Sequence, residues 1–353
     1  MSNRPKVQPW AVGASSLRFQ TLLSVLIPIA VTALLVIASK IDLSLAVITI
    51  YFPLQLVAAI FIGWRNFKHR GVKDSILLVV AGFLSALVLG LLFSVLFSVI
   101  GKGFETISAH FIYQNNIYVD NNTPLEYGGV GHAILGTLMI VALTTIVAVP
   151  LGIAMAIYLT TSRAKHLGFV RTVTQALSGL PSVVSGLFIL AFMSVVGLER
   201  SGLTGAMALF PLMLPTVARV AEESLKLVPA DLRQAALALG APNYRAFFQV
   251  VLPAAKSGIV TAVLLGLARV VGETAPLILT TNANNGTNLN IFAGGIASLP
   301  TYVYGFLGSG YVTSQQRAWG GALVLLILVG VLFGLARIFS RTKSTKAKAK
   351  RVK

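Results

Sequence analysis

Residues 231–253 read Asp-Leu-Arg-Gln-Ala-Ala-Leu-Ala-Leu-Gly-Ala-Pro-Asn-Tyr-Arg-Ala-Phe-Phe-Gln-Val-Val-Leu-Pro. Asp231 is a good N-cap residue, and Gln234 three positions later completes a capping-box pattern. Gly240 favours a left-handed C-cap, and Pro242 prevents the helix from continuing. The segment therefore predicts a helix of about 14 Å, too short to cross a bilayer.

The predicted helix is apolar on one face only, and a second helix is expected to follow from Asn243. The apolar positions of the first helix recur at helical spacing, at Leu232, Ala235, Ala236 and Leu239. The second helix would bring Phe247, Phe248 and Val251 together before Pro253. We call residues 231–253 the knob. A short helical pair with one apolar face suits a groove on a partner protein.

On either side of the knob the chain is strongly apolar. It has 353 residues, 56% of them hydrophobic and 11% charged, whereas a soluble domain carries about 25% charged residues. About 20 mainly apolar residues are needed for a helix to cross a bilayer. Eight stretches meet this requirement: 19–39, 45–64, 75–101, 132–160, 170–198, 202–220, 254–281 and 318–339. The sequence predicts an all-α transmembrane protein of about eight spans.

The net charge is +18, and the Lys and Arg residues that produce it are divided unequally between the two expected sides of the membrane. With a cytoplasmic amino terminus, most Lys and Arg residues fall in the inside segments 1–18, 65–73, 163–171, 219–256 and 337–353. The outside loops hold Lys40, Lys102, Arg200 and Arg317. This positive-inside bias predicts that both termini are cytoplasmic. The tail 341–353 is expected to be disordered and attracted to anionic membrane lipid.

Two pairs of ionisable residues lie in or beside spans, where charges are costly. Arg269 and Glu273 are four residues apart in the seventh span, and Arg219 and Glu222 are three apart at the cytoplasmic end of the sixth. Each pair is interpreted as lining a substrate path, where Arg offers a fork of donors to an oxyanion. The alternatives are an ion bridge that fixes helix packing for the first pair and an ordinary cytoplasmic flank for the second.

Hydroxyl side chains gather near the Gly and Pro residues at 179–181. Ser178, Ser182 and Ser185 could supply neutral donors to the same path, although serine on a membrane helix often only packs. Pro or Gly also occurs inside other spans, at Pro150, Pro211, Pro215 and Pro276. Broken helices are tolerated where they line a protected cavity, so this pattern favours a translocation path.

The knob resembles the coupling loop of the permease subunits of bacterial ABC importers. That loop has Glu-Ala-Ala, three residues, Gly, nine residues, then a hydrophobic residue, any residue, Leu and Pro. Here the matching positions are Gln234, Ala235, Ala236, Gly240, Leu252 and Pro253. The resemblance implies that these residues contact an ATPase. Gln234 departs from the pattern because it lacks the charge of Glu, so a salt bridge at that point is in doubt.

Further strings resemble one family of these permeases, the phosphate-import PstA family. They are residues 178–184 (Ser-Gly-Leu-Pro-Ser-Val-Val), 222–225 (Glu-Glu-Ser-Leu), 228–229 (Val-Pro), 272–277 (Gly-Glu-Thr-Ala-Pro-Leu) and 298–300 (Ser-Leu-Pro). The resemblance covers about residues 130–340. It implies a type I ABC importer permease bundle that moves phosphate by alternating access across the inner membrane. Family members usually have six spans, so the first hairpin is an addition.

The resemblance also implies partners and a domain organisation. The partners would be the sister permease PstC, an ATPase dimer of PstB, and the phosphate-binding protein PstS. PstB would bind ATP and Mg²⁺; this chain lacks the Gly-rich loop that holds ATP, so no cofactor of its own is expected. The expected parts are a basic segment and extra hairpin (1–74), the permease domain (75–340, with core 130–340 and coupling loop 222–253) and the tail (341–353).

Other functions stay open or are disfavoured by the residues present. A permease for another oxyanion or for phosphonate, and a membrane sensor or scaffold of the transport complex, are the alternatives. Nucleic-acid binding is disfavoured because the knob offers only Arg233 and Arg245 against Asp231, and DNA binding needs several phosphate contacts. The chain has no cysteine, which excludes disulfides and thiolate sites. No catalytic or metal-binding constellation is evident, so an enzyme is not expected.

Overall fold

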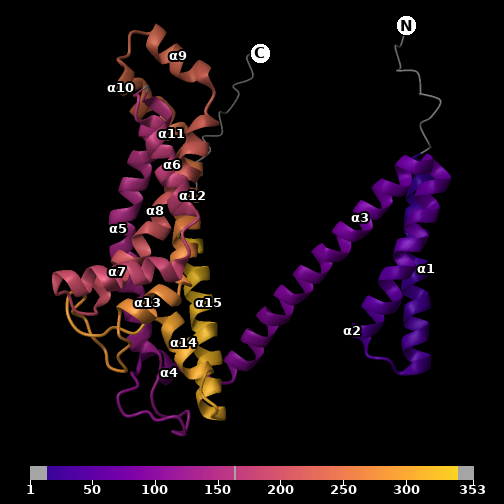
Figure 1. Ribbon diagram of the computed structural model, residues 1–353, viewed down its shortest axis with the longest axis horizontal. Coiled ribbons are helices and arrows are strands. Elements are labelled where there is room, and N and C mark those ends of the chain that lie inside the picture. The colour runs from indigo at the N-terminus through magenta and orange to yellow at the C-terminus, as the bar shows by residue number, and fades with distance from the viewer. Residues whose placement is uncertain (1–13, 163, 341–353) are drawn as a thin grey trace, which may run out of the picture. The chain divides into compact units, whose positions relative to one another are not determined.

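The computed structural model describes residues 14–162 and 164–340 (Figure 1). The chain divides into two compact units, residues 1–97 and 98–353, and the division falls inside one long helix. The expected basic amino-terminal residues 1–13 and the basic tail 341–353 lie outside the described residues. The expected domain boundaries at residues 74 and 340 stay predictions.

The first unit contains the predicted extra hairpin. Its elements are α1 (Ala14–Ser39), α2 (Leu43–Ala46), the π-helix η1 (Val47–Tyr51) and the first part of α3 (Phe52–Phe104). Lys68 has non-helical backbone angles, φ 51° and ψ −135°, and separates two candidate spans: Leu43–Asn66, which runs from α2 into α3, and Lys68–Phe104. The segment 65–73, expected as a linker, is therefore helical on both sides of a single kinked residue.

The second unit is a helical bundle, and its described residues contain no strand. Its helices after α3 are α4 (Ala109–Tyr113), α5 (Gly131–Thr161), α6 (Leu167–Ser178), α7 (Ser182–Val196), α8 (Gly202–Lys226), α9 (Ala230–Ala238), α10 (Asn243–Arg245), η2 (Ala246–Val251), α11 (Leu252–Ala254), α12 (Lys256–Val271), α13 (Ala275–Thr280), α14 (Leu299–Leu307) and α15 (Val312–Ser340). The short helices α9 and α10 lie at one end of the bundle, and α4 lies at the opposite end (Figure 1).

Helix α8 is the centre of the bundle. Leu209, Leu212, Met213 and Val217 on α8 are fully buried, and they pack with Ile140 of α5 and Val270 of α12 in one apolar cluster. Gly266 of α12 allows this approach, since a Cβ there would lie 2.7 Å from a methyl group of Val217. Small residues at helix contacts are typical of membrane bundles, where backbones must approach closely.

Six helices are long and apolar enough to span a membrane, and two bent helix pairs raise the number to eight among the described residues. The expected number of spans is thus confirmed. The predicted break of the fifth span near residues 179–181 is confirmed, because α6 and α7 meet there at 103°. The segment from α10 to α11 meets α12 at 66°, at the start of the expected seventh span. Pro181, the N-cap of α7, explains the first break, because proline cannot continue the preceding helix.

The other prolines do not all break their helices. Pro150 lies inside continuous α5, and Pro211 and Pro215 lie inside continuous α8. The expectation that these three mark broken spans is wrong. Neighbouring helices enclose α8 and can satisfy or shield the carbonyls that a proline leaves free. Pro276 does lie at a break, in the first turn of α13.

Candidate functional site: the cytoplasmic end of the bundle

The knob begins at α9, and its start differs from the expectation. The N-cap is Pro229, which makes no side-chain capping bond, and Asp231 is the second residue of the helix. The predicted capping box from Asp231 to Gln234 is therefore wrong. Proline at the cap holds an extended backbone (φ −56°, ψ 131°) that starts the helix two residues earlier. The Asp231 carboxylate lies instead in the first turn, where it complements the helix dipole.

The end of α9 agrees with the expectation. Gly240 adopts φ +84°, in the left-handed region. The N–H of Ala241 donates to the carbonyl of Ala236 at 3.1 Å, and the N–H of Gly240 donates to Leu237 at 2.9 Å. These two bonds form a Schellman motif. No atom lies within 4 Å of a Cβ built on Gly240, so its backbone conformation, and not space, calls for glycine here.

The second half of the knob anchors it to the bundle. Its helix begins at Asn243, as expected, and widens into η2. Phe247 and Val251 are buried in a cluster with Leu225 of α8 and Ala156 of α5, and Leu252 packs on this cluster. Phe248 is exposed, so only two of the three residues expected to cluster are buried together. The knob is thus fixed to the ends of α5 and α8.

The described chain leaves the apolar stripe of α9 largely uncovered. No residue of α9 is buried, and Leu239 just after it is 90% exposed. Gln234 and Ala235 are exposed beside Leu232, and Ala236 is half-buried. Pro253, the last residue of the coupling pattern, is also exposed, in α11. An apolar face that the chain itself does not cover is the expected property of a docking element.

Next to the knob, a pocket of about 240 Å³ lies between α6 and the end of α8, and most of its lining side chains are charged or polar; we call it the polar pocket. The Glu222 side chain is 10% exposed, and its Oε1 accepts from Arg171 Nη2 at 3.0 Å and from Lys226 Nζ at 2.5 Å. Arg219 pairs with Glu223 at 3.7 Å, both side chains exposed, and not with Glu222. The expected Arg219–Glu222 pairing is therefore wrong, although both residues line this pocket.

Sequence inspection missed Arg171 and Lys226. Arg171 is 51 residues away from Glu222 and joins it only through the packing of α6 on α8. Lys226 lies four residues after Glu222, on the same helix face, so its spacing offered a signal.

Arg269 lies away from this pocket. Its Nη1 donates to the hydroxyl of Thr216 at 3.3 Å, which ties α12 to α8. Helix α12 ends at Val271, so Glu273 no longer continues the helical face of Arg269. The ion pairs of residues 14–162 and 164–340 do not include Arg269 with Glu273, and that predicted pairing is wrong.

The serines near the α6–α7 break are divided among different environments. Ser178 ends α6, lines the polar pocket, and donates to the carbonyl of Thr174 at 2.9 Å. Ser182 is half-buried and starts α7. Ser185 is buried and donates to the carbonyl of Ala208 at 2.6 Å, which is a packing role. Ser178 therefore lies with Arg219 and Glu222, but Ser182 is not part of that pocket lining.

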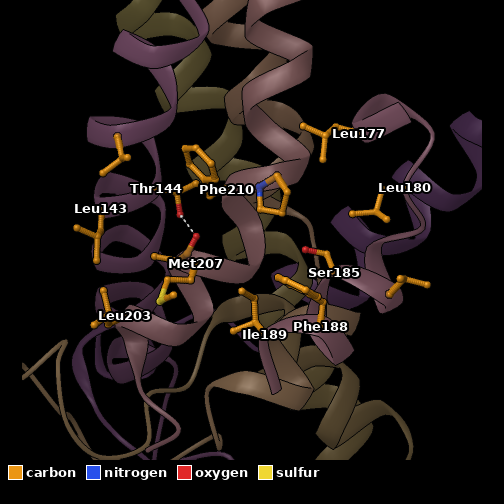
Figure 2. Close-up of a pocket in the computed structure, with 14 residues that line it drawn as sticks. Leu143, Thr144, Leu177, Leu180, Ser185, Phe188, Ile189, Leu203, Met207 and Phe210 are labelled. Atoms are coloured by element: carbon orange, nitrogen blue, oxygen red, sulfur yellow. Dashed lines mark hydrogen bonds between the residues drawn. The ribbon is translucent and has the colours of Figure 1, made fainter. Parts of the chain in front are cut away.

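A second pocket of about 560 Å³ adjoins the break and is almost wholly apolar (Figure 2). Leu177 and Leu180 at the break and Phe188 and Ile189 of α7 line it. Figure 2 shows the hydroxyl of Ser185 among these apolar side chains. The end of α6 thus borders a polar pocket through Ser178 and an apolar one through Leu177.

Comparisons with known proteins agree on one family. Residues 148–345 match the family described as binding-protein-dependent transport system inner membrane component. The phosphate transport system permease protein PstA 1 of Mycobacterium tuberculosis (strain CDC 1551 / Oshkosh) is 40% identical over 221 residues, which cover 62% of this chain and 72% of that protein. The PstA protein of Yersinia pestis is 36% identical over 287 residues, 79% of this chain and 92% of that protein.

The PstA protein of Pasteurella multocida matches almost from end to end. It is 34% identical over 281 residues, which cover 79% of this chain and 98% of the relative. The multi-span helical fold and the knob agree with an inner-membrane transport component that works with an ATPase and a substrate-binding protein. The chain belongs to the family of binding-protein-dependent transport system inner membrane components and, within it, to the PstA permeases.

Proposed function

We propose that this chain is the permease subunit through which an ATP-driven importer moves inorganic phosphate across the cytoplasmic membrane by alternating access. The relatives that match it over most of their length carry the name of phosphate transport permeases, which supports the substrate. The observation that carries the mechanism is the exposed apolar stripe of α9, on a knob whose second half is buried against α5 and α8. A force applied to that stripe reaches the spans directly.

The proposed partners follow from the same relationship. The sister permease PstC would complete the membrane path, a PstB dimer would contact the knob and hold ATP and Mg²⁺, and PstS would deliver phosphate from the outside. The residues proposed to contact PstB are Gln234, Ala235, Ala236, Gly240, Leu252 and Pro253.

The proposed substrate path contains Arg219, Glu222, Arg269, Glu273, Ser178 and Ser182. The polar pocket supports three of these, because Ser178, Arg219 and Glu222 line it together at the cytoplasmic end of α8. A guanidinium offers several donors in a plane, which suits the oxygens of a tetrahedral oxyanion. Arg269 is half-buried within a span, where an arginine is costly unless it serves a path or a packing contact.

Two alternatives remain to be separated from this proposal. A permease for another oxyanion or for phosphonate would share the knob and the pocket. A membrane sensor or scaffold would share the fold, but disruption of its knob would leave uptake by the transport complex intact.

The substrate is tested by uptake of [³²P]phosphate into cells that lack their own high-affinity phosphate importer and express this chain with its partners. We expect unlabelled phosphate and arsenate to suppress uptake, since arsenate is also a tetrahedral oxyanion with a similar charge, and sulfate and molybdate to leave it unchanged. Failure of unlabelled phosphate to compete would overturn the phosphate assignment. Competition by phosphonate or molybdate would favour the first alternative.

A further inference from the structure

We infer that Arg171 and Lys226 form an oxyanion-binding site at the inner mouth of the path, in which the carboxylate of Glu222 holds the place of the substrate. This inference rests on the proposed transport of phosphate. It assigns new roles to Arg171 and Lys226 and gives Glu222 the role of a competing internal anion.

The charges of Arg171, Lys226 and Glu222 meet at a single atom. One oxygen of Glu222, Oε1, accepts from two cations that belong to different helices, Arg171 of α6 and Lys226 of α8. Two cations facing one carboxylate leave one positive charge in excess. A carboxylate that is 10% exposed is stable only when paired, and here the paired oxygen marks the point at which both cations converge.

The space around this point is open to a small anion. Arg171, Glu222 and Lys226 all line the pocket of about 240 Å³. The side chains of Arg171 and Lys226 remain 45% and 54% exposed. Gln175, exposed on α6, adds a neutral amide donor to the lining. A phosphate oxygen that replaced Glu222 Oε1 would meet a guanidinium and an ammonium, the groups that bind oxyanions most strongly.

The site also lies next to the knob, which is the proposed contact of the ATPase. Lys226 is the last residue of α8, and Pro229 caps α9 three residues later. Arg171, in contrast, is on α6, which is joined to α7 through the break at residues 179–181. A displacement of the knob that shifted the end of α8 against α6 would change the separation of Lys226 and Arg171, because the two cations lie on different helices. The geometry links anion affinity at the inner mouth to the position of the knob.

The test measures binding without transport. The full complex in nanodiscs of zwitterionic lipid, without nucleotide or binding protein, is titrated with [³²P]phosphate in equilibrium dialysis. We expect Glu222→Gln to bind phosphate about tenfold more tightly than wild type, because the neutral amide no longer competes with phosphate for the two cations. Adding Arg171→Gln to that variant should remove the gain. Glu199→Gln, an exposed carboxylate outside the pocket, is the matched control and should bind like wild type.

Each outcome separates the inference from the proposed function. Unchanged affinity in Glu222→Gln, in a complex whose uptake is inhibited by phosphate, overturns the site and leaves the permease assignment standing. Absence of phosphate competition in uptake by wild type removes the proposed substrate whatever the binding result. A lipid headgroup shares the phosphoryl chemistry, so the titration is repeated with anionic phosphatidylglycerol. Loss of the gain in that lipid would assign the site to a headgroup and overturn its role for free phosphate.

Discussion

Replacing Gly240 with valine is expected to reduce ATP-driven uptake by about 30-fold while the protein still inserts into the membrane. Gly240 holds φ +84°, which a β-branched residue adopts at a cost of about 2 kcal/mol. That cost corresponds to a factor of about 30 in the equilibrium constant between the native turn and its alternatives. The Schellman bonds from Ala241 and Gly240 would be lost, and α9 would no longer present its stripe in register. Initial rates of [³²P]phosphate uptake, with membrane levels measured by immunoblot, give the comparison.

Gly168 provides the matched control for this variant. It is the second residue of α6, has no atom within 4 Å of a built Cβ, and does not adopt a positive φ. Gly168→Val should therefore transport at close to the wild-type rate. Normal uptake by Gly240→Val, accompanied by altered expression of phosphate-regulated genes, would instead support the sensor or scaffold alternative.

Replacing Arg317 with methionine is expected to destabilise the outer end of the bundle by about 3–5 kcal/mol. Arg317 is 0% exposed, and its guanidinium donates to the backbone carbonyls of Thr123, Pro124 and Tyr127, each at 2.8 Å. Methionine has a similar length but no donor, so three carbonyls would lose the guanidinium, and of these Pro124 would keep the N–H of Tyr127 at 3.2 Å. The thermal midpoint of the purified permease and the rate of proteolysis between residues 114 and 130 measure the effect.

Arg200→Met serves as the control for that experiment, because Arg200 is an exposed arginine in another outer loop. It should leave both the thermal midpoint and the proteolysis pattern unchanged. Equal proteolysis of the Arg317→Met variant and the wild type would contradict the view that this guanidinium holds the loop.

Local features of the knob could be predicted from sequence where one residue determines the backbone. Gly240 is such a residue, because only glycine adopts its conformation without strain, and the end of α9 was predicted correctly. The start of α9 was predicted wrongly. Asp231 is a better cap by side-chain chemistry, but Pro229 already fixes the extended backbone that a cap requires.

Contacts between distant segments could not be predicted. Arg317 was expected to be an ordinary outer-loop charge, yet it lies in α15 and holds a loop about 190 residues earlier in the chain. The Arg171–Glu222 pair depends on the packing of α6 against α8, which local spacing does not specify. Spacing also suggested the Arg269–Glu273 pair, but the helix ends at Val271 before the second residue.

The effect of a proline on its own span could not be predicted from local sequence either. The sequence marks Pro150, Pro181 and Pro215 alike, but only Pro181 lies at a bend. Gly179 and Leu180 precede Pro181 outside any helix, whereas Pro150 and Pro215 are flanked by helix on both sides. Whether a proline breaks a span therefore depends on its neighbours in the bundle as well as on its own geometry.

Transfer of force from an ATPase to the knob is tested most directly at Leu239. The chain has no cysteine, so Leu239→Cys introduces a single thiol at a position that is 90% exposed. In membranes that contain only the permeases, a membrane-impermeant maleimide should label this thiol from the cytoplasmic side. Assembly with the ATPase should protect it, because the stripe would then lie in the partner's groove. Labelling from the outer side, or equal cytoplasmic labelling with and without the ATPase, would contradict this role of the knob.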